Sequence, residues 1–200
     1  MDELSKEYIV DFFSKKLLLF GNTPAAVGWS AAGQRQRYEC ILKLLPLEGH
    51  SILDFGCGKG DFYGFLKEKG INAEYAGMDI NQKLIETASH NFPDAEFLTL
   101  DIDTDNIPGT YDYIISCGVF NLNLQGVKEA AAGSLRKLFH HASKALLFNC
   151  LSTHSKTKDT NLLYFDPAEL LSQASVISIS SAIYDNLIEG DIFLLLSNKA

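Results

Sequence analysis

Three glycines at alternate positions, directly after a short apolar run, constrain this chain more than any other feature of its sequence. Residues 51–55 read Ser-Ile-Leu-Asp-Phe, and Gly56, Gly58 and Gly60 follow before helical periodicity begins at Asp61. Glycine permits tight turns and a close approach of the backbone to a ligand. The order of strand, glycine loop and helix therefore predicts a ligand-binding turn at the carboxyl end of a parallel strand.

Strands and helices are expected to alternate along the following part of the chain. Apolar runs predict strands. Between them, segments with helical periodicity predict helices, one of them over 124–139 and another after the helix-capping residue Asn81. Such non-alternating apolar strands favour a mostly parallel sheet covered on both faces. The predicted parallel strands are 51–55, 73–78, 95–100, 111–116 and 142–148.

The two ends of the chain differ from this pattern. Residues 176–183 and 192–196 predict two strands with a link too short for a crossover helix, so we expect an antiparallel hairpin. Residues 1–47 read as helices, broken around Gly21 and Pro24. We expect this N-terminal helical preface to form a lid.

The glycine loop does not fit the common phosphate-binding motifs. In G-x-G-x-x-G the third glycine would fall on Asp61 or on Tyr63, depending on the register, and the chain has no G-x-x-x-x-G-K-[ST]. Asp54 and Asp61 would also repel a pyrophosphate. These carboxylates are compatible with a cationic ligand.

What the segment from Asp54 to Gly60 resembles is motif I, D/E-x-G-x-G-x-G, of the class I S-adenosylmethionine-dependent methyltransferases. The resemblance spans about Trp29 to the C-terminus. It implies a Rossmann-like α/β fold with a mostly parallel seven-stranded sheet, helices on both faces, a C-terminal antiparallel hairpin and the helical preface. We expect a single domain over 1–200, with 1–47 as preface or lid and 48–200 as core.

The resemblance also implies S-adenosyl-L-methionine as the cofactor and places it on particular residues. The acid that ends the second strand, Asp79, would accept hydrogen bonds from both ribose hydroxyls, and Ile80 would pack on the adenine. Asp101 would receive the adenine amino group, and the Ile102 N–H would meet a ring nitrogen. The predicted cofactor-binding residues are Asp54, Gly56, Cys57, Gly58, Gly60, Asp79, Ile80, Asp101, Ile102, Cys117 and Val119.

Methyl transfer from a sulfonium is an in-line displacement in which the protein mainly aligns the acceptor and excludes water. A general base is needed only when the acceptor loses a proton. His154, Tyr164, Tyr184 and Asp185 follow later strands, but the sequence assigns none of them as the base. Trp29 could wall the pocket or be a core aromatic, and Arg37 could bind the cofactor carboxylate or form a surface salt bridge. The predicted substrate-binding residues are Trp29, Arg37, Phe120, His154 and Tyr164.

Composition narrows the substrate class. The formal net charge is −8, whereas nucleic-acid-binding surfaces are usually basic. Residues 116–119 read Ser-Cys-Gly-Val instead of the N/D-P-P-Y/F loop of amino-directed nucleic-acid methyltransferases, and no Pro-Cys motif is present. We therefore expect a small-molecule acceptor, either a metabolite or a sugar-like compound, with no nucleic-acid partner and no membrane.

His and Cys lack metal-ligand spacing, so no metal site is predicted, and the dispersed cysteines favour a cytoplasmic location. The acceptor atom and the oligomeric state stay open.

Three other functions stay open at this point. Asp79 lies at a distance that also suits an NAD ribose, so a nucleotide-cofactor oxidoreductase is one alternative, and NADH binding would discriminate it. A second is a non-catalytic module that binds S-adenosylmethionine. A third is aminopropyl transfer from a decarboxylated cofactor, for which an acidic acceptor groove would be suited.

Overall fold

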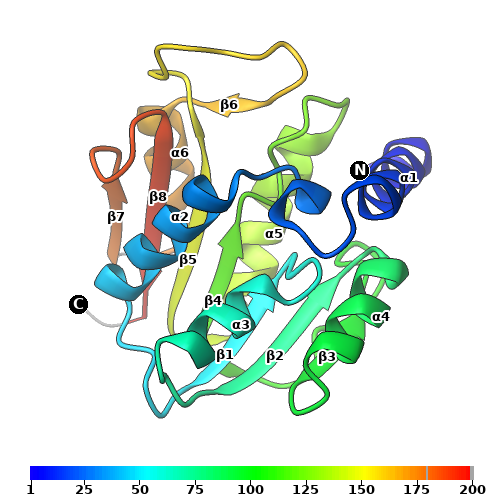
Figure 1. Ribbon diagram of the computed structural model, residues 1–200. Helices are drawn as coiled ribbons and strands as arrows, with labels where there is room; N and C mark the ends of the chain where they lie inside the picture. The colour runs from blue at the N-terminus through cyan, green and yellow to red at the C-terminus, as the bar shows by residue number, and fades with distance from the viewer. Residues whose placement is uncertain (179, 199–200) are drawn as a thin grey trace. The chain divides into compact units, whose positions relative to one another are not determined.

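The computed structural model describes residues 1–178 and 180–198, which form two compact units. The N-terminal unit comprises Asp2–Ile107, and the C-terminal unit comprises residues 108–200 together with Met1. Figure 1 shows the helices and strands of both. The single-domain organisation expected from the sequence stays a prediction.

The N-terminal unit contains three parallel strands in the order β3-β2-β1. A helix follows β1 and another follows β2 along the chain. Asp54 of β1 lies opposite Gly77 of β2, and Gly77 lies opposite Phe97 of β3. The elements are α1 (Glu3–Phe20), the 3-10 helix η1 (Pro24–Val27), α2 (Ala31–Leu44), β1 (Ser51–Phe55), α3 (Asp61–Glu68), β2 (Glu74–Asp79), α4 (Gln82–Asn91) and β3 (Glu96–Thr99).

Short polar side chains determine where the helices of this unit begin. The Asp2 carboxylate accepts the Ser5 N–H at 2.7 Å and caps α1, and Ser30 caps α2 in the same way. The Asn81 side chain caps α4, as expected from the sequence. Gly70, with φ of +70°, follows α3 at the C′ position, where the left-handed backbone favours glycine.

The C-terminal unit continues the parallel pattern and then reverses it. β5 pairs in parallel with β4 and β6, and β8 lies antiparallel between β5 and β7, so the expected hairpin is confirmed. The elements are β4 (Tyr111–Cys117), α5 (Val127–His140), β5 (Ala142–Ser152), β6 (Tyr164–Phe165), α6 (Pro167–Ser175), β7 (Ser180–Tyr184) and β8 (Asp191–Ser197).

The structure corrects several boundaries in this unit. β5 extends to Ser152 instead of ending at Phe148, and the described residues form the seven expected strands plus the two-residue β6. The strand predicted over 176–183 begins only at Ser180, because Val176 ends α6 and the N–H groups of 177 and 178 bind the Ala174 carbonyl. Residue 179 lies outside the described residues. The missed α6 had a local signal: Asp166 caps it and Pro167 is its first residue.

None of the helices formed by the described residues combines the length and the apolar character that a membrane-spanning segment requires. In the same part of the chain, no group of three or more His, Cys, Asp and Glu side chains is arranged to hold a metal ion.

Candidate functional site

The glycine loop connects β1 to α3 through three left-handed residues. Gly56, Gly58 and Gly60 have φ values of +75°, +57° and +82°. Such angles cost a side-chain-bearing residue free energy, which explains the alternation of glycines in the sequence. The N–H groups of Gly56 and Cys57 both donate to the Met78 carbonyl, at 2.7 and 3.0 Å, and anchor the loop to the end of β2.

Asp79, the last residue of β2, joins this loop to the start of α4. Its Oδ2 accepts the Gly58 N–H and its Oδ1 accepts the Asn81 N–H, both at 2.9 Å. Burial raises the pKa of Asp79, whereas these two hydrogen bonds act in the opposite direction. Each carboxylate oxygen retains a further lone pair, so the side chain can accept additional hydrogen bonds from a ligand.

Asp54 lies deeper, at 4% exposure, and is held by a tyrosine. The Tyr75 hydroxyl donates to Asp54 Oδ2 at 2.6 Å. Burial raises the pKa of Asp54 from 3.8 to about 7, although the tyrosine bond acts against this rise.

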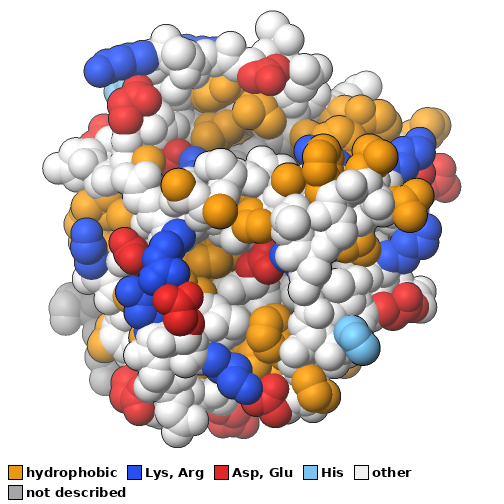
Figure 2. Space-filling view, viewed as in Figure 1, with side chains coloured by type: hydrophobic (Ala, Val, Ile, Leu, Met, Phe, Trp, Pro, Cys, Tyr) orange, Lys and Arg blue, Asp and Glu red, His pale blue; other side chains and the backbone are white. Residues whose placement is uncertain are grey.

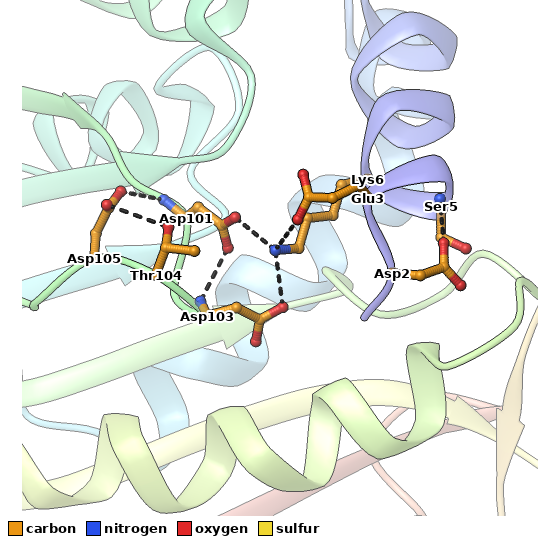
Figure 3. A network of polar contacts seen from close by, with 8 residues as sticks. All are labelled: Asp2, Glu3, Ser5, Lys6, Asp101, Asp103, Thr104 and Asp105. Carbon is orange, nitrogen blue, oxygen red and sulfur yellow. Dashed lines mark hydrogen bonds and ion pairs between the residues drawn. The ribbon is translucent and has the colours of Figure 1, made fainter.

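Asp101 is brought beside Asp79 by the end of β3, because the Leu100 N–H donates to the Asp79 carbonyl at 3.0 Å. Its carboxylate is already engaged. Oδ1 accepts the Asp103 N–H at 2.9 Å, and Oδ2 lies 2.7 Å from the Lys6 ammonium. Figure 3 shows Lys6 reaching from α1 to Asp101 and Asp103. Ile102, which follows, is buried at 9% exposure.

A cavity of about 700 Å³ opens between α1 and the ends of β2 and β3. Ile80 and Asp101, two predicted cofactor residues, contribute to its wall, whereas the opposite wall belongs to α1. Its lining residues are Glu3, Lys6, Glu7, Val10, Asp11, Ser14, Ile80, Asn81, Gln82, Lys83, Glu86 and Asp101.

The segment before β1 covers the glycine loop. A Cβ atom on Gly58 would lie 3.1 Å from Val27 Cγ1, so η1 packs directly on the loop. Lys59, at 1% exposure, pairs with Asp61, and Asp61 also accepts the Gln34 amide at 2.8 Å. These contacts attach η1 and α2 to the loop, and the lid expected of residues 1–47 stays a prediction.

Trp29 and Arg37, two predicted substrate residues, lie against each other in this segment. The Arg37 guanidinium lies 4.1 Å from the centre of the Trp29 ring, a cation–π distance, and its Nη1 donates to the Gly33 carbonyl at 3.1 Å. Trp29 thus supports Arg37 on α2, and the roles of both toward a ligand stay predictions.

The cysteine of the loop faces the sheet. A Cβ atom on Gly77 would lie 2.9 Å from Cys57 Sγ, and the thiol is 7% exposed. Burial raises the pKa of this thiol well above its usual value, so it is a neutral packing group.

The remaining predicted residues belong to the C-terminal unit. Cys117 Sγ lies 3.6 Å from Asn149 Oδ1, Val119 is half-buried, and the buried Phe120 packs 6.0 Å from the Phe148 ring. His154 is exposed and donates its N–H to Ser152 Oγ. The Tyr164 hydroxyl accepts the Asp159 N–H at 2.8 Å. Of the other base candidates, Tyr184 is half-buried in β7 and Asp185 is exposed.

Sequence reasoning missed three residues that organise the site. Tyr75 binds Asp54, Lys6 binds Asp101, and Lys59 fills the interior of the loop. Lys59 carried a weak signal, because it stands inside the motif. Nothing local marks the other two, whose partners are 21 and 95 residues away in sequence.

Known proteins resemble this chain in sequence and in fold. A family model described as a methyltransferase domain matches residues 52–141. The Mycobacterium tuberculosis protein Rv1506c, whose name assigns it provisionally to the methyltransferases, is 28% identical over 130 residues, which cover 60% of this chain and 75% of that protein. Ribosomal RNA small subunit methyltransferase C from Photobacterium profundum is 33% identical over 42% of this chain and 26% of its own length.

A solved structure agrees over nearly the whole chain. Magnesium protoporphyrin IX methyltransferase from Synechocystis PCC 6803, with bound S-adenosylhomocysteine, superposes with a TM-score of 0.70 at 16% identity, covering 98% of this chain and 99% of that one. These similarities favour the methyltransferase interpretation over the oxidoreductase alternative. The chain therefore contains a methyltransferase domain, recognised over residues 52–141, and has the Rossmann-like fold of S-adenosylmethionine-dependent methyltransferases.

Proposed function

We propose that the cofactor binds along the carboxyl ends of β1, β2 and β3 and that its methyl group passes to a small polar molecule. The hydrogen-bonded link from Gly58 through Asp79 to Asn81 carries this proposal. It fixes a carboxylate that can accept hydrogen bonds beside the glycine loop. In this proposal Asp79 binds the ribose hydroxyls and Asp101 the adenine amino group.

The residues present fit a cationic adenosyl cofactor. Gly56, Gly58 and Gly60 carry no side chain that could block a ligand, and Ile80 offers an apolar surface in the 700 Å³ cavity. Asp54 and Asp79 favour a positive charge over a phosphate. When bound, the cofactor supplies the activated methyl group and the leaving group. The protein contributes orientation, through Asp79 and the loop, and exclusion of water, through η1 over Gly58.

A small-molecule acceptor is supported by charge. The chain carries a net charge of −8. On the face shown in Figure 2, Lys and Arg side chains are interspersed with Asp and Glu. Basic side chains also form ion pairs with acidic ones, as in Arg35–Glu68 and Lys69–Glu39. A nucleic-acid substrate would favour a continuous basic surface, because phosphate contacts supply much of its affinity. Relatives include a ribosomal RNA methyltransferase, so RNA is the competing substrate class.

Calorimetric titration tests the cofactor site. Wild-type protein is titrated with S-adenosylmethionine, S-adenosylhomocysteine and NADH, and the titrations are repeated on Asp79→Ala. The control is Asp94→Ala, an acid that is exposed and pairs with Lys67. We expect micromolar binding of both adenosyl ligands by wild type and control, loss in Asp79→Ala, and no NADH binding. Unchanged affinity in Asp79→Ala would refute the ribose assignment.

A labelling experiment tests the acceptor class. The protein is incubated with methyl-tritiated S-adenosylmethionine and, separately, with small-metabolite and total-RNA fractions. We expect label in the metabolite fraction. Label in RNA alone would contradict the small-molecule proposal while leaving the methyltransferase assignment intact.

A further inference from the structure

Lys6 is a charged side chain that is almost completely buried. It is 5% exposed, and its ammonium lies 2.7 Å from Asp101 Oδ2 and 3.2 Å from both Glu3 Oε1 and Asp103 Oδ2. Lysine is rarely buried unless paired, and an ammonium has three N–H donors. Three carboxylates therefore engage all of its donors. The Asp101 hydrogen bond raises the pKa of Lys6 well above its usual value, so the side chain is a permanent cation.

A second contact holds α1 in place next to this ion pair. The Asn81 amide donates to the Val10 carbonyl at 2.9 Å and to Ser14 Oγ at 3.1 Å, and Asn81 is 1% exposed. The helix is thus attached at the end of β3 through Lys6 and at the end of β2 through Asn81. The 700 Å³ cavity lies between these attachments and α1.

We propose that Lys6 is a positioning residue for cofactor specificity, which holds Asp101 as a hydrogen-bond acceptor that selects a 6-amino purine and rejects a 6-oxo purine. This inference rests on the proposed cofactor site. It assigns to α1 a role that the cofactor motif does not contain, because Lys6 lies far upstream of that motif.

The hydrogen bonds that Asp101 and Lys6 already make support this selection. Asp101 uses one lone pair of Oδ1 for the Asp103 N–H and one of Oδ2 for Lys6, and each oxygen keeps another. A carboxylate can only accept hydrogen bonds, and Lys6 has no donor left for a ligand. A 6-amino group would find an acceptor here, whereas a 6-oxo group would face a carboxylate oxygen with no donor between them. An unpaired buried polar group of this kind is strongly disfavoured.

The test compares two ligands that differ at this position. S-adenosylhomocysteine and S-inosylhomocysteine, which carry a 6-amino and a 6-oxo group, are titrated calorimetrically into wild type, Lys6→Met, Lys6→Arg and Asp101→Asn. The matched control is Lys15→Met on the same helix, whose ammonium pairs with Asp11 and is largely exposed. Thermal melting of each variant establishes that it is folded.

We expect wild type to prefer the adenosyl ligand at least tenfold, about the effect of one charge-assisted hydrogen bond. Lys6→Met should lose about tenfold in adenosyl affinity and most of the preference, whereas Lys6→Arg and Lys15→Met keep the preference. Asp101→Asn should favour the inosyl ligand, because an amide can donate to the 6-oxo group.

Two results would overturn the proposal while leaving the cofactor site standing. One is an unchanged preference in Lys6→Met, and the other is tighter adenosyl binding in that variant, which would mean that Lys6 competes with the cofactor. If Lys6→Met does not fold, Asp101→Asn decides, and an unreversed preference there overturns the proposal. No adenosyl binding by wild type would instead refute the cofactor site, and this inference with it.

Discussion

Asp54→Asn is expected to make the protein more stable at neutral pH and to remove part of its pH dependence. Asp54 is 4% exposed, and burial raises its pKa from 3.8 to about 7. Asparagine has nearly the same shape, and its carbonyl oxygen can still accept the Tyr75 hydroxyl, which lies 2.6 Å from Asp54 Oδ2. The substitution therefore removes the charge and keeps the hydrogen bond.

The magnitude follows from linkage between protonation and folding. One pKa unit corresponds to about 1.4 kcal/mol, so a rise of about three pKa units makes the ionised carboxylate cost on the order of 4 kcal/mol. Because the pKa is higher in the folded protein, the folded state binds more protons. The contribution of protonated Asp54 to the stability of the folded state is therefore complete below about pH 4 and is lost as the pH rises to about 7. Above that pH it changes little.

Urea unfolding at several pH values between 4 and 8 measures this effect. The unfolding free energy of Asp54→Asn minus that of wild type should be near zero at pH 4 and rise toward about 4 kcal/mol at pH 8. Asp94→Asn is the control, because hydrogen bonding to Lys67 lowers the pKa of Asp94 and the expected sign is opposite. A difference that stays constant or falls with pH would refute the assignment of a buried, costly charge to Asp54.

Two further pairs of substitutions separate local effects by urea unfolding. Gly60→Ala should cost about 2–4 kcal/mol, because φ is +82° and the new Cβ would lie 3.0 Å from two phenylalanine rings, whereas Gly49→Ala, at φ +74° with open space around it, should cost about 1 kcal/mol. Equal losses would mean that packing against the loop adds nothing. Lys59→Met should lower the unfolding free energy by about 2 kcal/mol, because the partly exposed Asp61 loses its buried ammonium partner. Arg35→Met removes a half-exposed ion pair and should lower the unfolding free energy by less than about 1 kcal/mol. A larger loss at Arg35 would contradict this ranking.

Local sequence patterns predicted most of the helices and strands of the fold. The order of apolar runs and helical periodicity indicated β1 to β5 and the helices between them, and the short link before β8 indicated the antiparallel pairing. Asn81 was predicted as a helix cap, and the glycine alternation agrees with three left-handed residues. These features depend on neighbouring residues, which is why pattern and spacing reveal them. The strand predicted from Val176 begins only at Ser180, because Val176 ends α6.

The sequence by itself thus determined the class of fold, the glycine loop and the three acids at the ends of consecutive strands. Only the tertiary structure decided how those acids are held: Asp54 by Tyr75, Asp79 by two backbone N–H groups, and Asp101 by Lys6. The Lys6–Asp101 pair joins residues 95 positions apart, and no periodicity encodes it. Such partners are set by the packing of α1 against the ends of the strands, where burial makes an unpaired charge too costly to leave unmatched.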